Sequence, residues 1–141
     1  MIIGIDLDNT IIDYRNAFWK TALSTGIFSE SDRDSFSVEN GGVPDKNQIK
    51  HKLKSGEDND FKWKSLQGQV YGRYIQNASI YPGIFNFLLH SKKRGVKVYI
   101  ISHKTEFGHH DTSQTSLREE ALNFLKQNDL LSCDYGIQEK D

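Results

Sequence analysis

The sequence predicts an α/β protein, and the order of its apolar segments supports this prediction. A short apolar run, residues 1–5, opens the chain and leads into acidic residues, which is typical of a buried strand in a parallel sheet. A second, β-branched run, residues 96–101, follows an apolar helix that ends in basic residues and a glycine. Strand, helix and strand in this order form a βαβ unit with parallel strands and a right-handed crossover. Both strands should therefore end at the same edge of one sheet.

Composition limits the classes of function that fit the chain. Its 141 residues suit about one domain, and 18 basic against 19 acidic residues leave a net charge of -1. Such a balance gives no overall field that would attract nucleic acid or an anionic membrane. The single cysteine, Cys133, excludes an internal disulfide and fits a reducing compartment. With no apolar run of membrane-spanning length and no signal-peptide pattern, we expect a cytoplasmic protein without nucleic-acid or membrane partners.

Helices are predicted on both sides of a polar stretch that follows the first strand. The first covers residues 13–26, with Asp13 as its N-cap and Gly26 as its stop. Turn-forming residues dominate from 28 to 59, apart from a short helix over 48–55. A stronger helix is expected over 61–75, where apolar and aromatic residues recur at helical spacing and favour a core role: Trp63, Leu66, Val70, Tyr71 and Tyr74.

Two further helices are predicted in the second half of the chain. Residues 84–89 are apolar and begin after a Pro-Gly turn, and the basic turn before Gly95 ends this helix. Residues 116–126 form an amphipathic pattern that begins with a capping box made by Ser116 and Glu119.

Polar side chains follow each predicted strand. Asp6 and Asp8 come at the end of the first strand, and side chains two residues apart in an extended chain project to the same side. Two adjacent carboxylates repel unless a cation or a shared proton compensates them. Ser102 follows the second strand and should emerge at the same edge, where open α/β sheets bind ligands. The plainer interpretation is turn chemistry, with Asp-Asn-Thr and Ser102 as ordinary residues at strand ends.

The residues Asp6-Leu7-Asp8-Asn9-Thr10 behind an apolar strand resemble motif I, Asp-x-Asp-x-Thr, of the haloacid dehalogenase (HAD) superfamily. Ser102 at the end of the later strand resembles motif II. The resemblance covers residues 1–13 and about 80–128. It implies a Rossmannoid parallel sheet with helices on both faces, built from residues 1–25 and 78–141. Residues 26–77 would then be a mostly helical cap inserted between the first two strands.

The resemblance also implies a chemistry, that of a Mg²⁺-dependent phosphatase acting on a small phosphorylated metabolite. Asp6 would attack phosphorus to give an aspartyl-phosphate, and Asp8 would serve as general acid and then base. Thr10 would support the turn and Asp8, and Thr10, Ser102 and Lys104 would form the site for the substrate phosphate. Asp6 and Asp8 would also hold the Mg²⁺ ion.

The chain departs from the family pattern after Ser102. No lysine can be assigned to motif III, and no strand followed by paired acids, the pattern of motif IV, is found before Asp141. We therefore expect an incomplete core, with one edge of the first strand unpaired and open to self-association. An alternative is an inert phosphate- or metal-binding remnant of a HAD domain. A receiver-like signalling domain ranks third, because its phosphoacceptor follows a middle strand whereas these acids lead the chain.

The loop after Ser102 carries three histidines, His103, His109 and His110. A metal or a phosphate could recruit them, but their spacing matches no closed zinc site. A solvated loop is the simpler interpretation.

Overall fold

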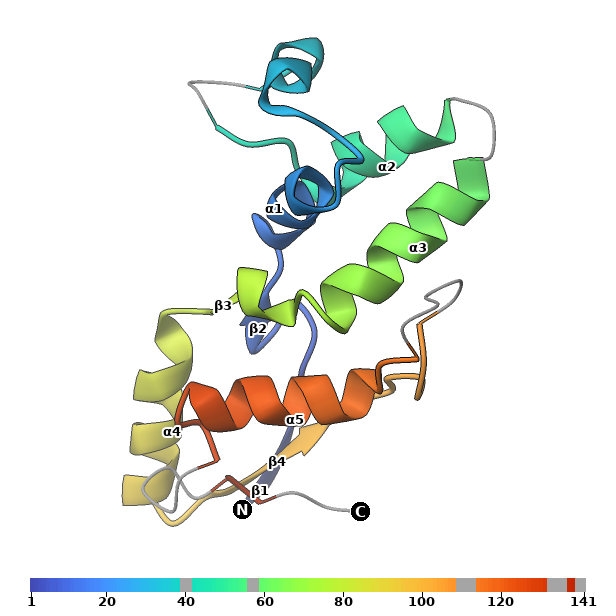
Figure 1. Ribbon diagram of the computed structural model, residues 1–141. Helices are drawn as coiled ribbons and strands as arrows, with labels where there is room; N and C mark the ends of the chain where they lie inside the picture. The colour runs from blue at the N-terminus through green and yellow to red at the C-terminus, as the bar shows by residue number, and fades with distance from the viewer. Residues whose placement is uncertain (39–41, 56–58, 109–113, 132–136, 139–141) are drawn as a thin grey trace.

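The computed structural model describes residues 1–38, 42–55, 59–108, 114–131 and 137–138. It shows a mixed α/β fold with a parallel sheet in the order β1 (Ile2–Asp6), β4 (Lys97–Ile101) and β5 (Ile137–Gln138), which confirms the predicted class (Figure 1). Asp6 pairs with Ile101 at the end of the β1–β4 ladder, so the residues that follow both strands leave at one edge of the sheet, as predicted.

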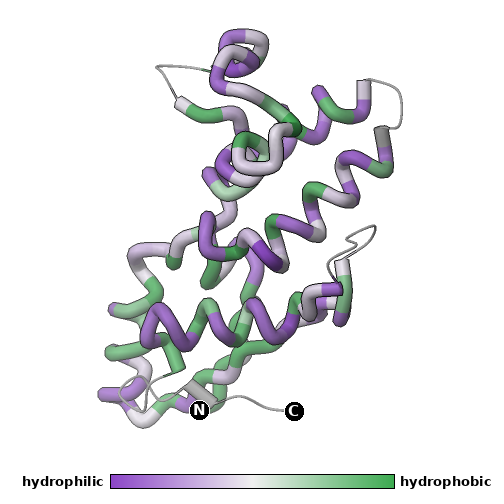
Figure 2. Tube along the Cα trace, viewed as in Figure 1, coloured by the Kyte–Doolittle hydropathy of each residue, from purple (hydrophilic) through white to green (hydrophobic). Residues whose placement is uncertain are grey.

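The burial of β1 differs from the prediction. This strand was expected to be buried, yet Ile2 is 69% exposed and only Ile3 and Ile5 are half-buried. Exposed and half-buried positions alternate along β1, so one face of the strand is open to solvent. In β4, Val98 is fully buried while Ile101 is 55% exposed. Figure 2 shows the apolar character of these strands. An apolar run in the sequence does not reveal whether one face of the strand is buried or both.

A helical segment lies between the two long strands. It is flanked by two short strands, β2 (Ile12–Asp13) and β3 (Ser79–Ile80), which pair antiparallel and which the sequence did not predict. Between them come the 3-10 turns η1 and η3 and the helices α1, α2 and α3, with these bounds: α1 Ala17–Ser24, η1 Glu30–Ser35, α2 Lys46–Lys54, α3 Asn59–Tyr71 and η3 Ile75–Asn77. After β3 come α4 (Gly83–Lys93), which packs against β4, and, beyond β4, α5 (Leu117–Gln127), which packs against α3 and η3.

Most helix ends follow the predicted signals. Gly26 and Gly95 adopt positive φ values of 71° and 66° just after α1 and α4, a conformation that favours glycine. The Ser116 side chain accepts a hydrogen bond from the Glu119 backbone N–H, as a cap of α5 should. Asp13, however, is not an N-cap: it lies in β2, and its carboxylate binds the Arg15 side chain instead.

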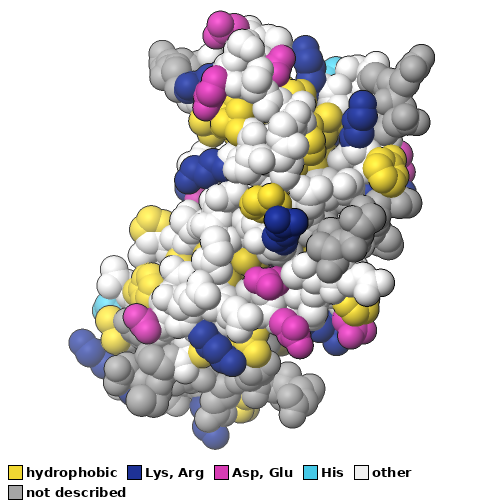
Figure 3. All heavy atoms as spheres, in the orientation of Figure 1, with side chains coloured by type: hydrophobic (Ala, Val, Ile, Leu, Met, Phe, Trp, Pro, Cys, Tyr) yellow, Lys and Arg dark blue, Asp and Glu magenta, His cyan; other side chains and the backbone are white. Residues whose placement is uncertain are grey.

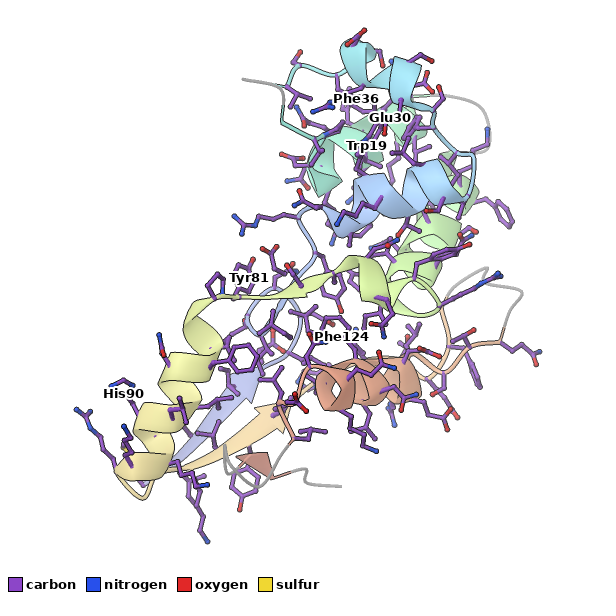
Figure 4. The ribbon with its side chains drawn as sticks, turned by 60° about the vertical axis from the view of Figure 1, so that its left-hand side comes forward. Trp19, Glu30, Phe36, Tyr81, His90 and Phe124 are labelled. Atoms are coloured by element: carbon purple, nitrogen blue, oxygen red, sulfur yellow. The ribbon has the colours of Figure 1, made fainter. Side chains whose placement is uncertain are left out.

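One hydrophobic cluster runs from the sheet into the helical segment. In the helical part, Trp19 of α1 and Phe36 face each other in an edge-to-face contact 5.7 Å apart (Figure 4). The predicted core stripe of α3 is confirmed for Trp63, Leu66 and Val70, which are buried. Helix α1, which the sequence analysis assigned to the core, packs on α2 and α3 of the expected cap. The predicted boundary between core and cap at residues 25 and 26 stays a prediction.

The described surface mixes charges of both signs, as the face in Figure 3 shows. No helix in the described part of the chain is long and apolar enough to cross a bilayer.

Candidate site around Asp8 and Lys104

A tight turn after β1 sets the position of Asp8. The backbone N–H groups of Ile11 and Ile12 both donate to the Leu7 carbonyl at 3.0 Å, and Asn9 N–H donates to the Ile12 carbonyl at 2.9 Å. Asn9 itself has a φ of 59°, a left-handed conformation that asparagine tolerates better than most residues. The turn brings the chain back on itself, so that Tyr14 lies beside Asp8.

The Asp8 carboxylate is held from two directions. The Tyr14 hydroxyl donates to Oδ1 at 2.9 Å, and the Lys104 ammonium contacts Oδ1 at 2.8 Å and Oδ2 at 3.0 Å. The Lys104 side chain is only 6% exposed, whereas that of Asp8 is 31% exposed. Arg118 of α5 supports this arrangement, because its Nε donates to the Lys104 carbonyl at 3.1 Å. A lysine from the loop after β4 thus neutralises an acid from the turn after β1.

Two tyrosine rings flank the Lys104 ammonium. It lies 4.8 Å from the ring centroid of Tyr71 and 5.7 Å from that of Tyr14, within the range of cation–π attraction. The rings meet edge to face at 4.8 Å. Tyr71 comes from the last turn of α3, so the helical segment contributes directly to the site. The sequence assigned Tyr71 to the core stripe of α3. In the structure Tyr71 is half-buried, and its ring also contacts the Lys104 ammonium.

Tyr14 acts as a neutral donor. Burial raises the pKa of its hydroxyl above the ordinary value, and the negative charge of Asp8 raises this pKa further. The phenol therefore keeps its proton at neutral pH and donates a hydrogen bond to Asp8. Neither Tyr14 nor Tyr71 was predicted as a site residue, since no local pattern separates a buried tyrosine that packs from one that also binds an acid.

The other predicted site residues are exposed to solvent. Asp6 ends β1 with an exposed side chain, and within the described ranges no hydrogen bond or ion pair engages its carboxylate. Thr10 and Ser102 are exposed as well, the latter one residue beyond the Asp6–Ile101 pair. The structure therefore joins Asp8 to Lys104 and brings Asp6 and Ser102 to one sheet edge. Lys104, predicted to contact a substrate phosphate, contacts Asp8.

The oxygen atoms of this site suit a magnesium ion only when substrate phosphate supplies part of its coordination shell. Mg²⁺ commonly uses one or two carboxylates together with substrate phosphates, and Asp6 offers an unengaged carboxylate for this purpose. Among the described residues no group of three or more acidic, histidine or cysteine side chains could hold a metal. His103 is exposed, and His109 and His110 lie outside the described residues.

Comparisons of this chain with protein-family models, with curated proteins and with solved structures find no match. What the site can do therefore has to be inferred from its own geometry. That geometry is an acid held by a buried ammonium and a phenol, beside an exposed acid and an exposed hydroxyl at the end of a parallel sheet.

Proposed function

We propose that this chain is a HAD-like, Mg²⁺-dependent phosphohydrolase that cleaves a small phosphorylated metabolite through an aspartyl-phosphate. One observation carries the proposal: Lys104, from the loop after β4, binds Asp8, from the turn after β1, at 2.8 Å. A lysine and two acids then lie where phosphate chemistry needs both signs of charge. A carboxylate that approaches a phosphate to ~4 Å meets a repulsion of about 4 kcal/mol per unit charge at an effective dielectric constant near 20.

Each residue has a role that its surroundings support. Asp6 is exposed and unengaged by the described residues, so its carboxylate is free to attack phosphorus while the alcohol leaves. Asp8, oriented by Tyr14, gives a proton to the leaving oxygen and later takes one from the attacking water. Ser102 donates its hydroxyl to a phosphoryl oxygen, and Thr10 supports the turn.

The Asp6 carboxylate and the Asp8 backbone carbonyl would hold Mg²⁺, with substrate oxygens and water completing its shell. The ion supplies positive charge that stabilises the phosphoryl group as it is transferred. Lys104 adds a second positive charge on the side of Asp8.

A second candidate is a domain that binds phosphate or metal without turnover. Two observations favour it: the Asp8 carboxylate is already occupied by Lys104, and the described residues supply no third acid for a metal. A carboxylate whose two oxygens already contact the Lys104 ammonium has to leave that contact before it can meet a leaving oxygen.

Turnover of p-nitrophenyl phosphate with 5–10 mM Mg²⁺ tests the proposal, with EDTA as the metal-free arm. We expect activity that EDTA and Asp6→Asn both abolish, with far-ultraviolet circular dichroism unchanged. Asp34→Asn, an exposed acid in η1, is the matched control and should keep full activity. Phosphate binding without turnover would support the second candidate, whereas turnover retained in Asp6→Asn would refute the assigned nucleophile.

A further inference from the structure

Lys46 is a second lysine close to the site, and it comes from the helical segment. It occupies the first turn of α2, where it is half-buried. Its ammonium donates to the Tyr71 hydroxyl at 3.0 Å and lies 5.4 Å from the ring centroid of the fully buried Phe18. The lysine is therefore held against aromatic surface.

The charge of Lys46 has no acidic partner in the described part of the chain. Its neighbour Asp45 uses its carboxylate to cap α2, where it accepts the Gln48 backbone N–H at 2.8 Å. Lys104 differs, because Asp8 neutralises it. An ammonium has three N–H donors, and one of those on Lys46 is used by Tyr71. A half-buried cation with donors to spare is suited to an anion that arrives from solution.

Tyr71 joins Lys46 to the ion pair of Asp8 and Lys104. The ammonium groups of Lys46 and Lys104 lie 5.6 Å and 4.8 Å from the centroid of the same Tyr71 ring. The Tyr71 hydroxyl accepts from Lys46, which leaves its own hydrogen for a further acceptor. The Tyr71 ring thus lies between Lys46 and Lys104, and Lys104 binds Asp8, to which the phosphatase proposal assigns acid–base chemistry.

We propose that Lys46 and the Tyr71 hydroxyl bind a second anionic group of the substrate. This inference rests on the proposed function and narrows its substrate class to small phosphomonoesters that also carry a carboxylate or another phosphate. The phosphoryl group to be cleaved lies at Asp6 and Ser102, and the second anion reaches the helical segment. A lysine that merely packs its stem on Phe18 and Tyr71 would affect stability without any preference among ligands.

Isothermal titration calorimetry with two probes tests this role: 2-phosphoglycolate, which carries both groups, and ethyl phosphate, which carries only the phosphate. In the presence of Mg²⁺ the native chain should bind phosphoglycolate about tenfold more tightly, the usual scale of one charge-assisted hydrogen bond. Lys46→Met should reduce the preference to less than twofold, and Lys46→Arg should retain most of it.

Lys50→Met is the matched control. Lys50 lies one turn further along α2 with its ammonium 5.7 Å from the Trp63 ring, so this variant removes the same charge from a similar aromatic setting. It should keep the tenfold preference. If Lys46→Met fails to fold, Tyr71→Phe gives the test instead, because it keeps the ring, removes the hydroxyl and should lower the preference about threefold.

The outcomes separate this inference from the phosphatase proposal. Asp6-dependent turnover with equal affinity for both probes would overturn the role of Lys46 and leave the phosphatase standing. A preference that depends on Lys46, without turnover, would establish the anion site and refute the catalytic function. Failure to bind either probe would overturn the anion site.

Discussion

Asp8→Asn should destabilise the chain more than Lys104→Met does, although both substitutions break the same ion pair. The difference comes from unequal burial, since 6% of the Lys104 side chain is exposed against 31% of that of Asp8. Without the carboxylate, the ammonium stays between Tyr14 and Tyr71 with neutral partners only. Without the lysine, the carboxylate keeps the Tyr14 hydroxyl at 2.9 Å and still reaches water.

The expected magnitudes follow from this difference. Removing one partner of a fully buried ion pair costs about 3–5 kcal/mol, and the partial exposure of Asp8 lowers the expected cost of Asp8→Asn to about 2–3 kcal/mol. Lys104→Met keeps an apolar stem against Tyr71, so its cost should be about 1 kcal/mol. The double variant should be more stable than Asp8→Asn alone, which corresponds to a coupling energy of about 1–2 kcal/mol.

Urea unfolding followed by tryptophan fluorescence measures these free energies, because Trp19 and Trp63 are both buried. The native chain, the two single variants and the double variant form a double-mutant cycle, and its interpretation requires that all four have equal m-values. If the two single variants lose equal free energies of unfolding, or if Lys104→Met loses more, the prediction is refuted. The Lys104 ammonium would then not depend on Asp8 more than Asp8 depends on Lys104.

Three further predictions concern the turn after β1, the Asp13 pair and the sheet edge. Asn9→Val should destabilise the fold by about 1–2 kcal/mol in thermal melts and Asn9→Gly by much less, because the φ of 59° suits asparagine and glycine but not a β-branched residue; equal melting temperatures would contradict this. The hydrogen bonds from Arg15 hold the pKa of Asp13 below its ordinary value, so this pair should stabilise the fold at higher pH and lose its contribution as the pH falls through the lowered pKa. Arg15→Gln should therefore reduce the acid dependence of unfolding below about pH 4, and an unchanged acid limb would refute the link. Sedimentation velocity should detect association between copies through the edge of Ile2–Ile5 that has no partner strand in the described sheet, and a monomer at all concentrations would contradict it.

The elements that depend on local pattern could be predicted from the sequence. Both long strands, the glycines after α1 and α4 and the Ser116 cap follow from short-range chemistry, and the structure confirms them. The burial of β1 could not be predicted, because an apolar run looks the same whether one or both of its faces are covered. The N-cap role of Asp13 was wrong because a tertiary pairing of two-residue strands, β2 with β3, took that residue out of the helix.

The candidate site was only partly predictable for a similar reason. Asp6, Asp8 and Ser102 were found because each follows a strand directly in the sequence. Tyr71 lies more than 60 residues from Asp8 in the chain and meets the site only because α3 packs over it. Lys104 was chosen for a phosphate, and only the folded loop shows that its ammonium reaches Asp8.

The antiparallel pairing of β2 with β3 has a consequence for engineering the chain. It opposes Ile12 to Ile80 and Asp13 to Ser79, so the helical segment leaves the sheet region and returns to it at neighbouring points. An insertion whose ends lie together can be exchanged for one of another length without altering the register of the sheet that carries it. Chimeras that swap residues 14–78 are therefore feasible at this junction, provided that the replacement restores Tyr14, Tyr71 and the apolar surface that the segment shares with the sheet and with α5.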